Sequence, residues 1–492
     1  MSNITRNNGV NNVIVNFIWR FLERCGAQGV TFIVSIVLAR VLDPEVYGTI
    51  ALVTVFTTIM QVFVDSGMGN ALIQKKNADD LDFSSVFYFN MLMCSVLYLI
   101  IFLSAPLIAA FYDSPELTSI VRVLSLILII SGLKNVQQAY VSKNMLFKKF
   151  FFATLGGTIG AAVVGIIMAC LGFGVWALVA QMLFNTAIDT IILWITVKWR
   201  PKKMFSLNRI KGLFSFGWKL LVSALLDTVY NDLRQLIIGK LYTSSNLAQY
   251  NRGKQFPHLI VSNINSSIDS VLLPTMSKVQ NDSGAVKSMT RRAIKTSTYI
   301  MMPIMVGLAV CAESLVSLVL TDKWLPCIPF LRVFCFTYAF YPIHTANLNA
   351  IKAMGRSDLF LILEIIKKVV GVILLLATMF QGVMAMAYSL LISTLIASFV
   401  NAFPNKKLLG YSYFEQIRDM LPQLGLSLAM AAIVYCVEFL KLSSIITLLI
   451  QIPLGVLIYI AASKMFKVES FEYILSMIKN MLSKKKKQGE SK

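Results

Sequence analysis

About fourteen apolar segments, each close to 20 residues long, run through this chain of 492 residues. At a rise of about 1.5 Å per residue, a helix of that length spans the hydrocarbon core of a bilayer. The chain is therefore predicted to be an all-α integral membrane protein. We expect spans at about 14–39, 46–68, 84–111, 117–141, 151–171, 173–197, 213–238, 247–273, 294–320, 327–351, 359–380, 382–403, 421–440 and 443–464.

The composition agrees with a membrane protein. Hydrophobic residues make up 57% of the chain and charged residues only 14%, whereas a soluble protein carries about 25% charged residues. The formal net charge of +21 would suggest nucleic-acid binding in a soluble protein. Here most of the excess lies in short loops and in the tail, where the positive-inside rule explains it. We therefore expect no nucleic-acid partner.

Loops rich in basic residues alternate along the chain with loops that hold few of them, and this alternation predicts the orientation of the chain in the membrane. The opposite loops hold few charges, so the positive-inside rule places the basic loops and both termini in the cytoplasm. The basic loops are those with Lys75 and Lys76, Lys143 to Lys149, Lys198 to Lys211, Lys278 to Lys295, Lys352 and Arg356, Lys406 and Lys407, and the tail Lys484 to Lys487.

The longest basic loop, Trp199 to Lys211, predicts a division into two six-helix lobes. We expect an N-lobe at 1–198 with spans one to six, a basic linker at 199–212, and a C-lobe at 213–405 with spans seven to twelve. Spans thirteen and fourteen then occupy 406–466, and a basic tail follows at 467–492. Glycines alone separate spans five and six, and Gln381 and Gly382 separate spans eleven and twelve, which predicts two tight helical hairpins.

A weak internal repeat supports two related lobes. Leu38-Ala39-Arg40-Val41-Leu42, Tyr47-Gly48 and Asp65-Ser66 in the first half correspond to Ile238-Gly239-Lys240-Leu241-Tyr242, Tyr250 and Asp269-Ser270 in the second. The offset is about 200 residues, and both hairpins have the same orientation. A parallel repeat relates its halves by an axis along the membrane normal.

Four of the expected spans carry charged and polar residues one helical turn apart. A charge inside a span costs about 2.5 kcal/mol or more on insertion scales, and residues three or four apart share a helix face. These stripes lie in spans one, two, seven and eight: Asn16, Arg20, Glu23, Arg24 and Gln28; Thr54, Thr58, Gln61 and Asp65; Lys219, Ser223, Asp227 and Arg234; Lys254, His258, Ser262, Asn265 and Asp269.

Two interpretations of the stripes stay open. The charges can pair within the bundle and fix its packing, as Glu23 can with Arg20 or Arg24, and Arg20 and Lys219 can extend to the headgroups. Alternatively, the stripes wall a water-filled cavity. Its cations lie at two depths and suit an anionic headgroup such as a pyrophosphate. These substrate-binding candidates are Arg20, Arg24, Lys219, Arg234 and Lys254.

The carboxylates of the stripes suggest coupling to an ion gradient. Glu23, Asp65, Asp227 and Asp269 are candidates to bind H⁺ or Na⁺. His258 is a candidate proton relay, although a lone histidine in a span is more often a packing residue. The chain has two histidines, too few by themselves for a metal site, and we expect neither a metal nor an organic cofactor.

Two sequence stretches carry a family resemblance. They are Leu38-Ala39-Arg40-Val41-Leu42-Asp43-Pro44-Glu45-Val46-Tyr47-Gly48, which follows Leu22-Glu23-Arg24, and Asp65-Ser66-Gly67-Met68-Gly69-Asn70-Ala71-Leu72-Ile73-Gln74. With them the chain resembles the polysaccharide-transporter (Wzx-type) flippases of bacteria, over essentially its whole length. These belong to the multidrug/oligosaccharidyl-lipid/polysaccharide exporter superfamily.

The resemblance implies a fold and a function. The fold would be two six-helix lobes around a cationic cavity, plus two C-terminal helices. The function would be translocation of an undecaprenyl-pyrophosphate-linked oligosaccharide (a unit of O-antigen, colanic acid or another exopolysaccharide) to the outer leaflet of the bacterial inner membrane. Alternating access and ion coupling are expected, with membrane lipids and polysaccharide polymerase or assembly proteins as partners. The family offers no catalytic motif, so we expect no enzyme.

Two alternatives remain at this point. A small-molecule exporter of the same superfamily usually carries cationic cargo, which the basic excess of the stripes disfavours. A membrane polysaccharide polymerase or glycosyltransferase typically needs a large extracytoplasmic loop or a cytosolic domain. The extracytoplasmic loops expected here are shorter than about 20 residues, within the range of plain connectors.

Overall fold

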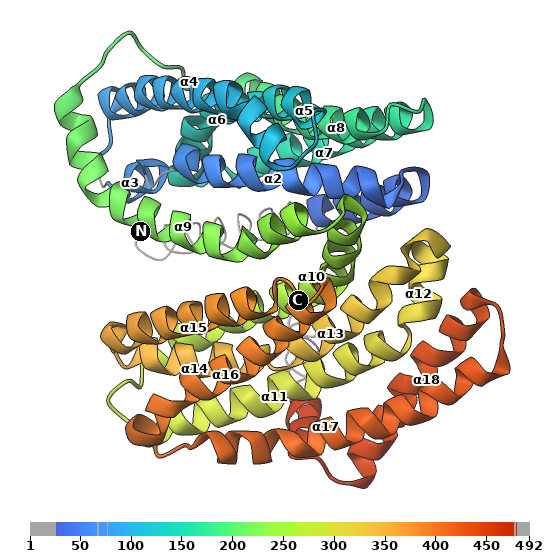
Figure 1. Ribbon diagram of the computed structural model, residues 1–492. Coiled ribbons are helices and arrows are strands. Elements are labelled where there is room, and N and C mark those ends of the chain that lie inside the picture. The colour runs from blue at the N-terminus through green and yellow to red at the C-terminus, as the bar shows by residue number, and fades with distance from the viewer. Residues whose placement is uncertain (1–25, 66–67, 76, 477–478, 480–492) are drawn as a thin grey trace, which may run out of the picture. The chain divides into compact units, whose positions relative to one another are not determined.

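The computed structural model describes residues 26–65, 68–75, 77–476 and 479 (Figure 1). All regular secondary structure in these residues is helical, which confirms the all-α prediction. The chain forms two compact units, the first ending at Ala248 and the second beginning at Gln249. The long helix α10 (Ser244–Ser277) spans the boundary between them.

The first unit is built around apolar clusters that include Leu38, Leu124 and Leu128 in one group and Leu72 and Leu193 in another. Helix α9 packs along α2 and also contacts α3 and α4, so this compact unit extends beyond the expected linker at 199–212. Its described helices are Gly26–Val41, α2 (Pro44–Asp65), α3 (Met68–Gln74), α4 (Asp80–Phe111), α5 (Leu117–Leu124), α6 (Leu126–Lys143), α7 (Phe147–Cys170), α8 (Val175–Thr196) and α9 (Leu207–Leu241).

The second unit is organised around α11, which packs against α13, α14, α16 and α17. Tyr299, Met430 and Tyr459 form part of an apolar cluster between α11, α17 and α18. After α10, the elements are α11 (Ser283–Val310), α12 (Ala312–Val319), η1 (Asp322–Cys327), α13 (Ile328–Ala339), α14 (Tyr341–Ala353), α15 (Ser357–Thr378), α16 (Val383–Leu409), α17 (Tyr413–Tyr435), η2 (Cys436–Leu440) and α18 (Ser444–Met465). A further helical segment covers 469–476.

Ten helices in the described part of the chain are long and apolar enough to cross a membrane. The expected count of fourteen is not confirmed. Helices form at spans seven, eight and eleven, as α9, α10 and α15, but these helices are not among the ten. Helices α9 and α10 are rich in charged and polar residues, and α15 carries four charges, Asp358, Glu364, Lys367 and Lys368. The first part of expected span one, residues 14–25, lies outside the described residues, and the rest falls in the helix Gly26–Val41.

The fourth expected span of each half is a broken helix, and span 294–320 is also divided, into α11 and α12 at Cys311. Span 117–141 divides into α5 and α6 at Ser125, and span 327–351 divides into α13 and α14 at Phe340. Pro342 stands at the start of α14, where its missing N–H costs no helical hydrogen bond. The two breaks are a first structural sign of the internal repeat.

A matched interaction lies beside each break and agrees with the predicted repeat. Arg122 on α5 donates from Nε to the carbonyl oxygen of Phe102 on α4, at 3.2 Å. Arg332 on α13 donates from Nε to the carbonyl oxygen of Ala309 on α11, also at 3.2 Å. Because α4 and α11 are the third spans of their halves, the same arginine bond joins equivalent helices twice.

The two predicted hairpins are present. Gly172 and Gly174 join α7 to α8 with φ angles of 82° and 55°, and Gly382 precedes α16 with φ of 106°. Glycine adopts this left-handed region without the steric penalty that a side chain brings. Helices α7 and α8 then run side by side in Figure 1 and pack closely.

Helix α4 begins with a reciprocal cap. The amide of Asp82 donates to Asp79 Oδ1 at 2.9 Å, and the amide of Asp79 donates to Asp82 Oδ2 at 3.2 Å. This bond from the Asp82 amide holds the pKa of the exposed Asp79 carboxyl below its ordinary value. Lys75 also pairs with Asp82, at 2.6 Å, so the chain before α4 is tied to its first turn.

Candidate functional site

The predicted site residues are distributed over both compact units. Arg20, Glu23 and Arg24 lie outside the described residues, and for Lys219 on α9 the structure describes only the backbone. The other six residues are described. The first unit contains Asp65, Asp227 and Arg234, and the second contains Lys254, His258 and Asp269.

Helix α9 presents an accessible polar face. Ser223, Asp227 and Asn231 are exposed, and Arg234 is half-buried. Spacings of four and three residues place these side chains on one face of the helix. Arg234 lies seven residues beyond Asp227, or about 10 Å along the axis. This face offers a carboxylate and a guanidinium at two levels of the same helix.

Helix α10 presents a second polar face, which is longer and richer in hydroxyl and amide groups. Lys254 is half-buried, and the ring of the exposed His258 packs edge-on against Tyr338 with centroids 5.8 Å apart. Against lipid, so many exposed polar groups would be costly. A hydrated environment suits them. The exposed polar residues of α10 between His258 and Ser270 are Ser262, Asn263, Ser266, Ser267, Asp269 and Ser270 itself.

Asp65, at the end of α2, is held by amide groups. Asn135 on α6 donates from Nδ2 to Asp65 Oδ1 at 3.2 Å and to the Val64 carbonyl oxygen at 3.1 Å. Gln61, one turn earlier on α2, donates to the same Asp65 oxygen at 3.3 Å. These donors orient the carboxylate of Asp65. Within the described residues, no cation forms an ion pair with this carboxylate.

Asp269, at the equivalent position of the repeat, is held in the same way. Asn349 on α14 donates from Nδ2 to Asp269 Oδ1. Asn135 and Asn349 both lie on the second part of the broken fourth span of their half. Asp65 and Asp269 are thus each bonded to an asparagine, a partner that the sequence pattern did not identify.

The structure also reveals an ion pair that the sequence pattern did not predict. Lys134 on α6 and Asp189 on α8 lie 2.9 Å apart, and their side chains are only 17% and 12% exposed. Each residue is a lone charge in a long apolar run, and this feature of the sequence could have indicated the ion pair. Their 55-residue separation hid the pairing. The low exposure indicates a role in holding α6 against α8.

A buried amide network joins three helices of the second unit. Asn347 on α14 donates to Gln416 on α17 at 2.7 Å, and Asn405 on α16 donates to Asn347 at 2.6 Å. His344 bonds Asn401 at 2.9 Å one turn away. Buried polar networks of this kind fix a single packing arrangement. They supply a rigid support on which a polar face can be held.

The asparagine partners of the two aspartates give a matched test. Asn135→Ala and Asn349→Ala should each lower the free energy of unfolding by about 1–2 kcal/mol, because a hydrogen bond to a charged acceptor is lost. Asn144→Ala is the control, since the exposed Asn144 side chain donates to the carbonyl oxygen of Tyr140 in its own helix and to no other described residue. Denaturant unfolding of the purified chain measures the change. Equal stability of all three variants would contradict the matched role.

The fold and these faces define a multi-pass membrane protein with accessible polar faces on α9 and α10. The chain belongs to the polysaccharide biosynthesis protein family, whose family pattern matches residues 37–329. The family that the motifs predicted is thereby confirmed.

Known proteins of this kind resemble the chain in sequence and in fold. The teichuronic acid biosynthesis protein TuaB of Bacillus subtilis (strain 168) is 26% identical over 310 residues, 62% of this chain and 63% of TuaB. The succinoglycan biosynthesis transport protein ExoT of Rhizobium meliloti (strain 1021) is 24% identical over 307 residues, 62% of each chain. The chain thus spans less than two thirds of these relatives' lengths.

A solved structure shares the fold at low sequence identity. The lipid II flippase MurJ, in an inward closed conformation, matches with a TM-score of 0.73 and 18% identity, over 93% of this chain and 98% of MurJ. This likeness establishes the helical architecture.

Proposed function

We propose that this protein is a flippase that moves an undecaprenyl-pyrophosphate-linked oligosaccharide from the cytoplasmic to the outer leaflet of the bacterial inner membrane. The observation that carries the proposal is the polar face of α10, in a chain that is 24% identical to ExoT, a succinoglycan biosynthesis transport protein. A face rich in amide and hydroxyl groups suits a hydrated sugar chain.

The charges on α9 and α10 support an anionic headgroup as part of the cargo. Arg234 and Lys254 add cationic groups to these faces, and a pyrophosphate is best held by donors of this kind. Arg20, Arg24 and Lys219 are proposed to supply the cations at the second of the two depths expected from the sequence. An uncharged substrate would not require cations at two levels.

Alternating access is the proposed mechanism, with H⁺ or Na⁺ as the coupling ion. Asp227 and Asp269 are exposed carboxylates on the two faces, and Glu23, Asp65 and His258 are the other candidates. The basic loops support a cytoplasmic location for both termini. Polysaccharide polymerase or assembly proteins are proposed to receive the translocated unit.

A translocation assay with a matched pair of variants tests the proposal. Arg234→Ala should slow appearance of the lipid-linked glycan on the far side of proteoliposomes at least tenfold, because a headgroup contact is lost. It should also abolish complementation of a flippase-deficient strain. Lys211→Ala removes an exposed charge from the same helix and should transport normally.

The same assay separates the other functional classes. Transport at the wild-type rate by Arg234→Ala would overturn the site assignment. Covalent change of the glycan would instead indicate a polymerase or glycosyltransferase. Export of small cations, with no movement of the lipid-linked glycan, would indicate a small-molecule exporter.

A further inference from the structure

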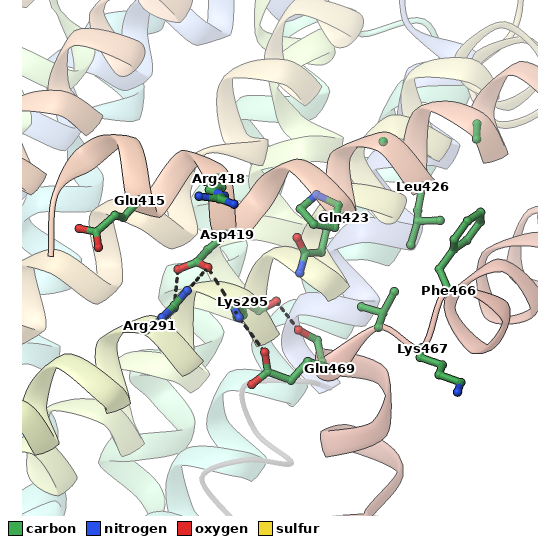
Figure 2. Close-up of a pocket in the computed structure, with 15 residues that line it drawn as sticks. Arg291, Lys295, Glu415, Arg418, Asp419, Gln423, Leu426, Phe466, Lys467 and Glu469 are labelled. Atoms are coloured by element: carbon green, nitrogen blue, oxygen red, sulfur yellow. Dashed lines mark hydrogen bonds and ion pairs between the residues drawn. The ribbon is translucent and has the colours of Figure 1, made fainter.

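A charge network holds three segments of the second unit together. It crosses a pocket of about 820 Å³ that is bounded by α11, α17 and the chain that follows α18. Figure 2 shows Arg291 and Lys295 of α11 directed toward Asp419 of α17. Arg291 donates from Nε and from a terminal nitrogen to the two oxygens of Asp419, both at 2.7 Å, and Lys295 pairs with Glu469 at 2.6 Å. These contacts fix the three segments relative to one another, and they give the unit a rigid frame.

The first part of α10 is also fastened to this unit. Arg252 is only 5% exposed, and its guanidinium lies 4.7 Å from the centre of the Trp324 ring in η1. A Cβ built on Gly253 would lie 2.8 Å from the carbonyl oxygen of Cys327 and 2.8 Å from the amide nitrogen of Leu331. The backbone of α10 therefore packs directly on η1 and α13 at this point, and this contact holds the helix before Pro257.

Burial along α10 changes at Pro257. From 247 to 257 most residues are buried, whereas from 258 to 275 Val261 alone is buried. The exposed stretch carries the polar face described above. Helix α10 thus consists of a buried part and an exposed part that meet at a proline.

Prolines and hydroxyl side chains make the exposed part easy to bend. Pro257 and Pro274 lie inside α10, and each lacks the N–H that would bond the carbonyl oxygen four residues earlier. Prolines are a usual cause of helix kinks. Between them, Ser267 donates to the Asn263 carbonyl oxygen and Ser270 to that of Ser267, both at 2.8 Å. Hydroxyl groups that bond the preceding turn of their own helix also favour bending.

One bond ties the exposed part of α10 to a neighbouring helix. Asn349 of α14 donates from Nδ2 to Asp269 Oδ1, and within the described residues this is the one side-chain hydrogen bond between 258–273 and another helix. Asn349 is buried, whereas Asp269 is exposed. Because Asp269 is accessible, a hydroxyl group of a ligand can compete with Asn349 for its carboxylate. The bond therefore holds the exposed part in place and is open to competition.

We propose that α10 is a hinged helix, with its pivot at Pro257 and the bond between Asn349 and Asp269 as its latch. The part before Pro257 stays on η1 and α13, and the part that carries the polar face swings when the latch opens. A hydroxyl-rich cargo favours the open form, because release of Asn349 frees Asp269 Oδ1 to accept from a sugar hydroxyl. This role in transport rests on the proposed function. The hinge itself is measured without transport.

Hydrogen–deuterium exchange of the full chain, followed by mass spectrometry, tests the pivot. Exchange of backbone amides reports local opening, so peptides from 258–273 of the wild type should exchange about tenfold faster than those from 247–256. Pro257→Ala supplies the missing N–H and should slow exchange in 258–261 by about threefold. Pro106→Ala, at an exposed proline inside α4, is the control and should leave α10 unchanged. Equal rates on both sides of residue 257, in wild type and in Pro257→Ala, would overturn the hinge.

The same measurement tests the latch. Asn349→Ala should speed exchange of 258–273 by about fivefold, because the bond to Asp269 is lost. The increase should be larger there than in α11, which the charge network holds. An equal increase in α11 would indicate a general loss of stability, and it would overturn the latch.

Translocation of the lipid-linked glycan tests the purpose of the hinge. Pro257→Ala should slow translocation into proteoliposomes by about fivefold, because a conformational step is hindered, while Pro106→Ala transports normally. Transport at the wild-type rate by Pro257→Ala, with exchange slowed as expected, would overturn the role of the hinge in transport. A wild-type protein that moves no lipid-linked glycan would instead overturn the proposed function, and the exchange result for the hinge would stand.

Discussion

Gly48→Ala should lower the free energy of unfolding by about 3 kcal/mol or more, at or beyond the upper end of the usual cost of overpacking. A Cβ on Gly48 would lie 1.8 Å from the carbonyl oxygen of Ser244 and 2.4 Å from its carbonyl carbon. Because both are backbone atoms, no rotation of a side chain relieves the clash. We expect α2 to separate from the start of α10, with a large loss of folded protein on size-exclusion chromatography.

Gly29→Ala is the matched control for Gly48→Ala. Gly29 lies in the preceding helix and is exposed, and a methyl group added there would have no atom within 4 Å. Alanine in a helix is favoured over glycine by up to about 1 kcal/mol, so this variant should be as stable as wild type or more stable. The two alanines should thus have effects of opposite sign. Wild-type stability of Gly48→Ala would refute the close contact.

The second large effect concerns the ion pair of Lys134 and Asp189. Lys134→Met should lower the free energy of unfolding by about 3–5 kcal/mol, because it leaves a poorly exposed carboxylate without its cation. Asp189 Oδ1 is already buried without a hydrogen-bond partner among the described residues. Lys134 is therefore the main compensation for this charge.

The double variant Lys134→Met/Asp189→Leu separates pairing from packing. Replacing both charges with apolar residues removes the unpaired charge, so most of the stability should return. Lys198→Met is the control, since Lys198 is exposed just after α8, and its effect should stay within about 0.5 kcal/mol. Unfolding in denaturing detergent, followed by tryptophan fluorescence, measures all three. A double variant no more stable than Lys134→Met would contradict a mainly electrostatic role.

The resemblance motif acquires a physical explanation from the fold. In the sequence, Tyr47 and Gly48 are family signals with no chemistry attached. In the structure, the Tyr47 hydroxyl lies 3.5 Å from the Ser35 carbonyl oxygen, and Gly48 lies against Ser244. Both residues therefore act in helix packing within the first unit. The presence of Tyr47 and Gly48 in the motif therefore reflects a crossing of helices and not a binding site.

The sequence by itself determined the features that depend on local periodicity. Apolar segments of bilayer length predicted the helices, and glycine at Gly172 and Gly382 predicted the hairpins, because only the local backbone matters there. The offset of about 200 residues also predicted a repeat, with which the matched bonds of Arg122 and Arg332 agree.

Only the tertiary structure decided which polar groups meet. Asn135 with Asp65, Asn349 with Asp269, and Lys134 with Asp189 are separated by 70, 80 and 55 residues. Helix periodicity fixes the face on which a side chain lies, but not the helix that it faces. Partners on distant helices are selected by the packing of the whole unit, since burying a polar group is favourable only where a complementary group is present. For the same reason, the pocket between α11, α17 and the chain after α18 has no counterpart in the sequence pattern.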